Sequence, residues 1–119
     1  MITMNKNEKA FLMTYRSPQN FEHFESLLEG AKSILAYLKT QTEAQRPITI
    51  GNACRRSYSS VTQICQKLME LKVVKRVPLG VEVVTISDYS PFTGNTLNKD
   101  IEVERFGYIF VDRNFSFDD

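Results

Sequence analysis

Apolar residues recur at every third or fourth position between Phe21 and Leu38, which is the period of an amphipathic helix. Ser17 and Pro18 precede this stripe and are typical of a helix start, because Ser caps the first turn and Pro fits its first position. A break at Gly30 is an alternative, since Gly costs a helix about 1 kcal/mol relative to Ala. The stripe predicts a core helix, and its first part also fits a dimer seam. The residues assigned to the seam are Phe21, Phe24 and Leu28.

A second helical pattern surrounds a short polar joint. Thr49 is predicted to cap a short helix that ends near position 56, with Ile50 and Cys54 on its inward face. Ser60 and Gln63 have the spacing of a capping box, which predicts the start of a further helix at Ser60. Apolar residues then recur with helical spacing and predict an amphipathic helix of about 10–12 residues. They are Val61, Ile64, Cys65 and Leu68.

After position 72 the pattern changes from that of a helix to that of strands. Residues 73–77 and 81–86 are rich in Val, which favours strands, and residues 78–80 between them form a Pro-Leu-Gly turn signal. Residues 87–100 are polar with Pro and Gly, so we expect a long loop there, followed by a strand over residues 101–111. The C-terminal part therefore predicts an antiparallel β-hairpin or a small sheet.

The chain has 119 residues, which is the length of one domain. Residues 1–16 are weakly patterned, and their KAFLMTYR stretch fits a strand and the start of a helix equally well, so we expect an N-terminal arm. Residues 17–119 are expected to form a single domain with an extended first helix and a long hairpin loop at 87–100. Helices followed by a hairpin make the expected fold class α+β.

The net charge of +1 is unevenly distributed along the chain. Residues 55–76 hold six basic side chains and one acidic one, whereas residues 77–119 hold three basic and eight acidic side chains. A basic stripe in a nearly neutral chain is typical of a protein that binds a polyanion such as nucleic acid. The alternative is a solvated helix face that happens to be basic.

The stretch ITIGNACRRSYSSVTQICQKLMELKVVKR combines these features in a particular order. Ile50 opens the short helix, the small residue Gly51 follows it, and a serine-rich joint leads to the amphipathic helix. This order, with a hairpin after it, resembles the winged helix-turn-helix DNA-binding superfamily, closely over residues 24–86 and more loosely over residues 101–111. The resemblance implies a winged-helix fold, in which a three-helix core is followed by a C-terminal β-hairpin.

Two residues depart from the pattern of that superfamily. Arg56 stands where an apolar residue usually precedes the joint, so either its side chain points outward or the second helix is rotated. Lys72 stands where a Gly usually ends the third helix in a left-handed conformation. Both departures concern the details of the joint and not the fold.

The resemblance implies that the third helix enters the major groove of double-stranded DNA, where each base pair presents a distinct edge. The residue types also suit this role, because Gln bonds to adenine, Ser and Thr bond to bases or phosphates, and Tyr and Arg reach phosphates. A dimer would read a near-palindromic site, as a transcriptional regulator does. The expected DNA-binding residues are Arg55, Arg56, Ser57, Tyr58, Ser59, Ser60, Thr62, Gln63, Gln66, Lys67 and Arg76.

The acidic hairpin favours a second interpretation. A wing that grips DNA is usually basic, whereas this part of the chain carries more acidic than basic side chains. The chain is therefore alternatively a winged-helix interaction module in a larger assembly, with the loop at 87–100 as a surface for a protein partner. A plasmid or phage replication protein is a third interpretation, because it would share the DNA-binding step.

The sequence offers little for catalysis. The single histidine, His23, is too few for a His-based triad or metal cluster, and a Gly-rich phosphate loop is missing. Cys54 and Cys65 fall on inward faces and are expected to be buried, inert thiols rather than a redox switch. Glu102 and Glu104 are expected to lie on an exposed strand face rather than to form a catalytic pair. We expect a protein that is not an enzyme and needs no metal or cofactor.

Location and partners follow from the same composition. No segment reaches the roughly 18 apolar residues of a membrane span, and the N-terminus lacks a signal-peptide pattern. We therefore expect a cytoplasmic protein with no membrane contact. Its expected partners are double-stranded DNA and a second copy of the chain.

Overall fold

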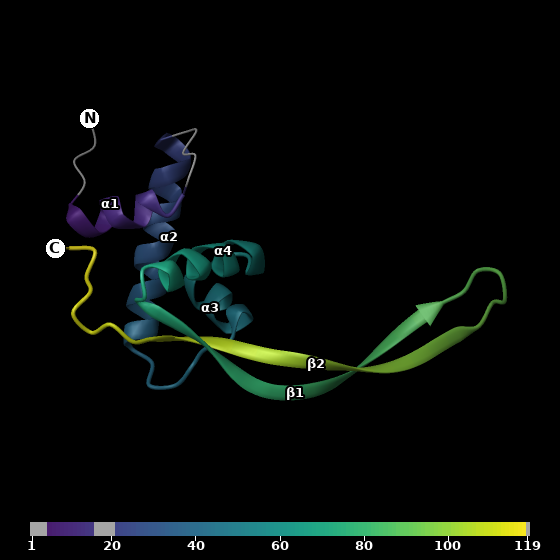
Figure 1. The fold of residues 1–119 in the computed structure, drawn as a ribbon. Coiled ribbons are helices and arrows are strands. Elements are labelled where there is room, and N and C mark those ends of the chain that lie inside the picture. Colours follow the sequence, from purple (N-terminus) through teal and green to yellow (C-terminus); the bar gives the residue numbers. More distant parts are fainter. Residues whose placement is uncertain (1–4, 16–20, 119) are drawn as a thin grey trace.

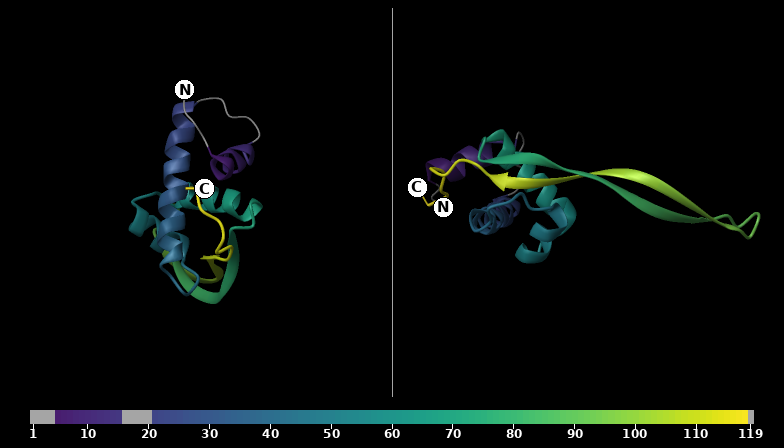
Figure 2. Two further views of the ribbon diagram at one scale, coloured as in Figure 1. Left: turned by 90° about the vertical axis from the view of Figure 1, so that its left-hand side faces the viewer. Right: turned by 90° about the horizontal axis from the view of Figure 1, so that it is seen from below.

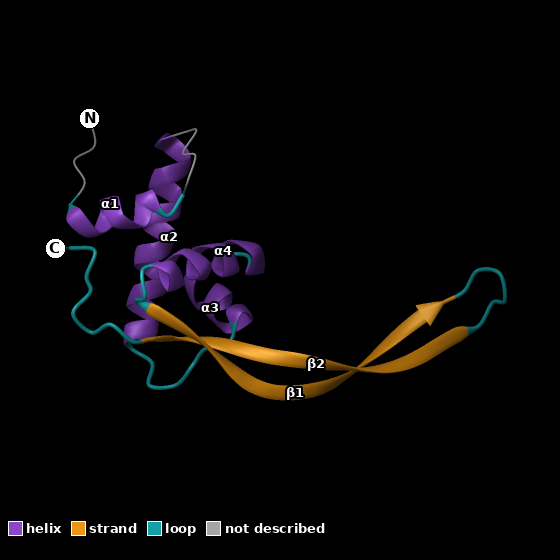
Figure 3. Ribbon diagram, viewed as in Figure 1, coloured by secondary structure: helices purple, strands orange, loops and turns teal. Residues whose placement is uncertain are grey.

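The computed structural model describes residues 5–15 and 21–118, with side chains in the second range from residue 25 onward. These residues form helices and an antiparallel hairpin, so the fold is α+β (Figure 1). The helices gather in one body, and the hairpin extends away from it (Figure 3). The elements are α1 (Lys6–Met13), α2 (Phe21–Lys39), α3 (Pro47–Cys54), α4 (Tyr58–Glu70), β1 (Val74–Tyr89) and β2 (Thr96–Phe110).

The core lies where α2, α3 and α4 bring their apolar faces together above the base of the hairpin. Removal of such helix stripes from water is the main driving force for folding. The predicted stripe of α2 is confirmed from Ala31 to Leu38, and the predicted inward faces of α3 and α4 are confirmed as well. The buried residues of these helices include Ala31, Ile34, Leu35, Leu38, Ile50, Val61, Ile64, Cys65 and Leu68.

The predicted dimer seam on α2 is only partly described. The helix itself includes positions 21 and 24, but the side chains of Phe21 and Phe24 lie outside the described residues. Leu28 is half-buried and packs against the core of its own chain. The predicted helix start at Ser17 and Pro18 also lies outside the described residues. The seam therefore stays a prediction.

The ends of α3 differ from the sequence-based prediction. Arg46 is the N-cap and Pro47 occupies the first helical turn, so the prediction that Thr49 caps this helix is wrong. Pro starts the helix earlier because its fixed φ angle is already that of a helix. At the other end Arg55 adopts a left-handed conformation with φ 57°, and the next N–H, of Arg56, donates to the Gly51 carbonyl at 2.9 Å. The chain therefore changes direction sharply between α3 and α4.

α4 also begins earlier than predicted. Ser57 is its N-cap, and the Ser57 side-chain oxygen accepts a hydrogen bond from the Ser60 N–H at 3.2 Å. The predicted capping box of Ser60 and Gln63 is therefore wrong. Ser57 has the extended backbone that an N-cap requires, and its oxygen satisfies one of the free N–H groups of the first turn. The serine-rich joint thus becomes the first turn of α4.

Lys72 ends α4 in the conformation for which Gly is usually chosen. Its φ angle is 61°, in the left-handed region. The Lys72 N–H donates to the Met69 carbonyl at 2.9 Å, and the Val73 N–H donates to the Leu68 carbonyl at 3.1 Å. This pair of bonds is a Schellman motif, which satisfies carbonyls at the helix end and turns the chain into β1.

The hairpin is longer and more regular than the sequence predicts. β1 runs without a turn through residues 78–80, where the register shifts by a bulge and Gly80 has φ 100°. The predicted turn there is wrong, because in a two-stranded ribbon each strand is an edge and tolerates Pro. The predicted loop at 87–100 is also wrong, since the strands continue to Tyr89 and from Thr96. Both faces of this ribbon are solvated, so its sequence contains many polar residues and has the composition that is typical of a loop.

The hairpin projects well beyond the helical body (Figure 2). The molecule measures 61 × 34 × 23 Å along its principal axes, and its radius of gyration is 18.2 Å. A compact domain of this length would have a radius of gyration of about 13–14 Å. The outer half of the ribbon therefore lies away from the rest of its own chain.

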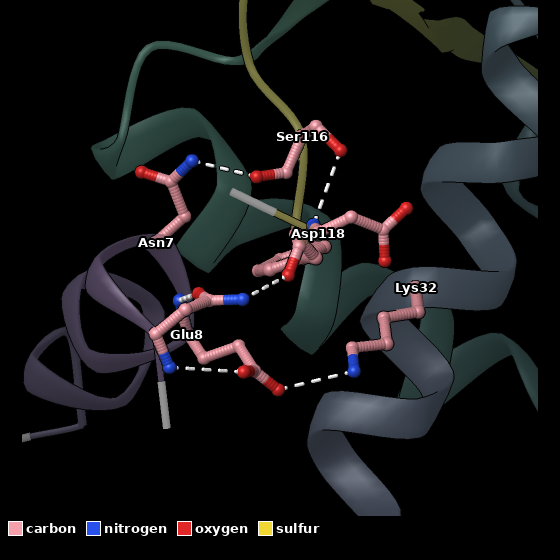
Figure 4. A network of polar contacts seen from close by, with 7 residues as sticks. Asn7, Glu8, Lys32, Ser116 and Asp118 are labelled. Atoms are coloured by element: carbon pink, nitrogen blue, oxygen red, sulfur yellow. Dashed lines mark hydrogen bonds and ion pairs between the residues drawn. The ribbon is translucent and has the colours of Figure 1, made fainter. Parts of the chain in front are cut away.

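α1 packs on the body instead of extending from it. Phe11 is buried in the core, although residues 1–16 were expected to form an arm of undecided structure. Asn7 donates to the Ser116 carbonyl at 2.6 Å, and Glu8 forms an ion pair with Lys32 of α2 at 3.0 Å (Figure 4). Asn5 caps α1 and also donates to the Phe117 carbonyl. α1 is thus held between α2 and the C-terminal segment.

Candidate nucleic-acid interface

One face of α4 is polar and open to solvent. Ser59, Gln63 and Gln66 are exposed on successive turns, and Thr62 beside them is half-buried. Two local bonds order this row: Thr62 Oγ1 donates to the Ser59 carbonyl at 3.1 Å, and Gln63 Nε2 donates weakly to Ser59 Oγ at 3.4 Å. The structure therefore brings four of the predicted contact residues together on one helix face, and the two glutamines are exposed to solvent on it.

The joint before α4 supplies a second group of predicted residues. Arg55 and Ser57 are exposed, and Tyr58 at the first helical position is 57% exposed. The Ser57 oxygen is engaged in the cap, and Ser60 is half-buried within the first turn. Arg55 and Tyr58 are thus the residues of the joint whose side chains are available to a ligand.

Lys67 is engaged within the fold. Its ammonium donates to the Thr14 carbonyl at 3.0 Å, lies 5.0 Å from the ring centre of Tyr15, and is 3.8 Å from Glu70. These contacts connect α4 to the end of α1. Lys67 was expected among the DNA-binding residues, and the structure shows its ammonium engaged in packing between α4 and the end of α1.

Arg56 lies between α4 and α2 rather than in solvent. It is half-buried, and a Cβ atom at Gly30 would come within 2.9 Å of its guanidinium carbon and 2.8 Å of Ile64 Cδ1. Gly30 therefore leaves room for Arg56 inside an otherwise regular helix. Of the two alternatives for Arg56, an outward side chain or a rotated second helix, the first is only partly realised, because the guanidinium lies close to Gly30 of α2.

Arg76 lies at the base of the hairpin. Its guanidinium carbon is 3.8 Å from the ring centre of Phe106, which is a close cation–π contact, and the side chain is exposed. The pKa of Tyr108 is raised by burial and by Cys65, while Arg76 lowers it and Tyr58 raises it slightly. Arg76 and Tyr58 therefore approach the same buried tyrosine from two elements.

Arg46 is a candidate residue that the sequence did not identify. It is exposed at the N-cap of α3 and lines a hollow of about 190 Å³ together with Tyr58 and residues 103–106 of β2. This grouping depends on the hairpin lying beside α3, where the Gln45 N–H donates to the Tyr108 carbonyl at 2.9 Å. No local pattern signals this contact. Arg46 therefore joins Tyr58 at a hollow that Glu104 and Arg105 also line.

The prediction of a buried thiol is confirmed for Cys65 and only partly for Cys54. Cys65 is fully buried, and burial raises the pKa of its thiol to about 12, while Cys54 is half-buried. A thiol with such a pKa carries almost no thiolate at neutral pH and is a poor nucleophile. Within residues 5–15 and 21–118 no cluster of three or more His, Cys, Asp or Glu side chains is placed to hold a metal ion.

Comparison with protein-family models, curated proteins and solved structures gives no match for this chain. Among the helices that the structure describes, none is both long and apolar enough to cross a membrane.

Proposed function

We propose that this chain binds double-stranded DNA and inserts the exposed face of α4 into the major groove. The observation that carries the proposal is the polar row of α4, which is free of acidic residues until Glu70 and has Arg55 beside its start. An α-helix fits the major groove, where base edges are distinguishable. The order of elements, with the left-handed Lys72 where the winged-helix pattern has Gly, supports the same proposal.

The contacts in this proposal divide into base reading and phosphate binding. Gln63 and Gln66 would face the bases, because the Gln amide both donates and accepts at adenine. Arg46, Arg55 and Arg76 would lie along phosphates and provide most of the affinity without reading sequence. Arg56 and Lys67 would act indirectly, by holding α4 against α2 and α1.

The proposed biological role is a cytoplasmic transcriptional regulator. Such proteins bind as two-fold dimers whose recognition helices enter successive major grooves about one helical turn apart. The exposed polar face of α4 is what a base-reading helix needs in such a dimer, and a seam on α2 that includes Phe21, Phe24 and Leu28 would be one way to pair two copies.

The hairpin supports a second candidate function, an interaction module in a larger assembly. It projects from the body, and residues 80–105 hold five acidic and two basic side chains, so a phosphate backbone is a poor partner for this outer part. A replication initiator would combine the two properties, with DNA at α4 and a protein at the hairpin. A pull-down that recovers the same protein partner with and without DNA would favour the module.

Fluorescence anisotropy on a labelled duplex tests DNA binding. The chain should bind random-sequence DNA at low salt, with an affinity that falls steeply as salt rises. The double variant Arg46→Ala/Arg55→Ala should bind about tenfold or more weakly, and its salt slope should fall by about two, one unit for each lost phosphate contact.

The matched control for charge is Lys6→Ala/Lys9→Ala, which removes two exposed cations from α1. Its affinity for DNA should stay within about twofold of the parent, because α1 lies away from the proposed interface. Equal losses in the two double variants would mean that charge alone is responsible, and an absence of binding at low salt would refute the proposal.

A further inference from the structure

The outer part of the hairpin, residues 80–105 and here called the arm, lies mostly away from the described body, and only its inner end, residues 103–105, lines a hollow with α3. It extends away from the body in the right-hand view of Figure 2, and all of its residues are exposed or half-buried. An isolated two-stranded hairpin is only marginally stable in water, and a further strand, helix or sheet is needed to cover it. The arm therefore needs an explanation that the body does not provide.

The strand register gives the arm two different faces. Residues that pair across an antiparallel ribbon point to the same side, and successive residues point to opposite sides. One face carries Asp100, Glu102 and Glu104, with Val81 and Val83 opposite the two glutamates. This face has three carboxylates and no cation between residues 81 and 104, so it is unsuited to DNA.

The other face, here called the apolar face, carries five apolar and four charged side chains. Val84 pairs with Ile101, Glu82 pairs with Val103, Ile86 pairs with Lys99, and Asp88 pairs with Leu97. Ile86 is 45% exposed and Leu97 is 66% exposed, although large apolar side chains on a stable surface are usually covered when they adjoin one another. The apolar side chains of this face are Val84, Ile86, Leu97, Ile101 and Val103.

The charged groups on the apolar face are arranged so that reversing their order along the arm exchanges positive for negative charge. Nearest the body, Arg105 and Glu82 form an ion pair of 2.7 Å. Nearest the tip, Lys99 lies at the level of Ile86, and Asp88 lies two residues further on. Along the arm the order is therefore positive, negative, apolar, positive, negative, with the pair of Val84 and Ile101 at the centre.

We propose that a second copy of this chain covers the apolar face, with the two arms packed face to face and running in opposite directions about Val84. In this arrangement Glu82 of one copy lies opposite Lys99 of the second copy, and Arg105 lies opposite Asp88. Arms packed in the same direction would place like charges at the same level. A two-fold interface of this kind uses the same patch on both copies and closes upon itself.

The size of the face sets the expected strength of the pairing. From Arg105 to Asp88 the face is roughly 26 Å long, at about 3.3 Å per residue. Two strands give it a width of about 10 Å, so the interface is smaller than the roughly 1,200 Å² of stable complexes, and we expect a weak, transient dimer of micromolar affinity. The proposal does not depend on DNA binding by α4, and its test contains no DNA.

Sedimentation equilibrium of neighbouring valine variants tests the pairing. Val84→Lys adds a charge at the centre of the apolar face, whereas Val83→Lys adds the same charge to the acidic face, where Val83 is 62% exposed. The parent chain should dimerise in the micromolar range. Val84→Lys should weaken the dimer by about tenfold or more, because it would bury unpaired ammonium groups, and Val83→Lys should change it by no more than about twofold.

A charge exchange tests the direction of the arms. Lys99→Glu alone should weaken the dimer, and the double variant Lys99→Glu/Glu82→Lys should restore at least part of the loss, because the opposite charges then meet again between copies. A monomeric parent chain, a dimer that tolerates Val84→Lys, equal losses from the two valine variants, or no rescue by the exchange would each overturn the proposal. A dimer that survives Val84→Lys would place the interface elsewhere, such as on α2.

Discussion

Two glycines, Gly51 and Gly30, lie where the helices around α4 pack closely, so they affect the orientation of the proposed DNA-binding helix. A Cβ atom at Gly51 would lie 2.6 Å from the Arg56 carbonyl oxygen, which belongs to the backbone of the joint. At Gly30 the nearest atoms are the ends of two side chains, Ile64 and Arg56. Side-chain ends move more easily than backbone does, so Gly51 has the stricter requirement. The orientation of α4 therefore depends on one missing methyl group in α3.

Gly51→Ala should destabilise the protein by about 1–3 kcal/mol, because the joint must move to accept the added methyl group. Gly30→Ala is the matched substitution. Both changes gain about 1 kcal/mol of helix propensity, but we expect a smaller loss at Gly30, because there the added methyl group meets side-chain ends that can move aside. Urea unfolding measures both free energies. A loss from Gly30→Ala equal to that from Gly51→Ala would contradict this account of the joint.

At the scale of single elements, α1 shows how a weakly patterned segment becomes part of the body. Its apolar periodicity is poor, but Asn5 and Glu8 form a capping box, and Phe11 reaches the core. The backbone N–H of Asn5 lowers the pKa of Glu8 from its ordinary value of 4.5; burial opposes this, and the contact with Lys32 lowers the pKa further. α1 should therefore be held more firmly when Glu8 is ionised.

The pH dependence of stability should reflect this carboxylate. Its pKa is lower in the folded chain than in the unfolded one, so its contribution is complete above 4.5 and is lost as the pH falls through the folded pKa. Glu8→Gln keeps an acceptor for the cap but removes the charge. The stability difference between parent and variant should be largest near neutral pH and should shrink toward about pH 3.

Urea unfolding at several pH values makes this comparison. The control is Glu25→Gln at an exposed position of α2. For this variant the difference in unfolding free energy from the parent should change little as the pH falls. If the difference in unfolding free energy between the parent and Glu8→Gln stays constant with pH, the ion pair and the cap formed by Glu8 do not stabilise the folded chain.

At the scale of the whole molecule, the sequence predicted the helical body better than the hairpin. Helix periodicity identified the buried faces of α2 and α4, because it reflects a core that both helices share. The signals at residues 78–80 and 87–100 were local, and the ladder between β1 and β2 overrode them. The positions of Lys67 and Arg56 depend on α1 and α2, so no pattern within α4 could reveal their contacts.

The arrangement of charge is also a property of the whole molecule. The exposed polar row of α4 and most acidic residues of the arm lie on separate parts of the fold, since the arm projects away from the body (Figure 1). The exception is Glu104, which lines hollows with Arg46 and with Arg76. One chain can therefore present a face suited to a phosphate backbone and an arm suited to another protein. DNA binding and pairing of copies need not compete for the same surface.

Site-specific photo-crosslinking to duplex DNA tests the central claim most directly. A photoreactive amino acid at position 63 replaces Gln63 on the exposed face of α4, and the same group at position 102 replaces Glu102 on the acidic face of the arm. At low salt the group at position 63 should crosslink to the duplex and the group at position 102 should not. Crosslinking from position 102 without any from position 63, or from neither position, would contradict the assignment of α4 as the DNA-reading helix.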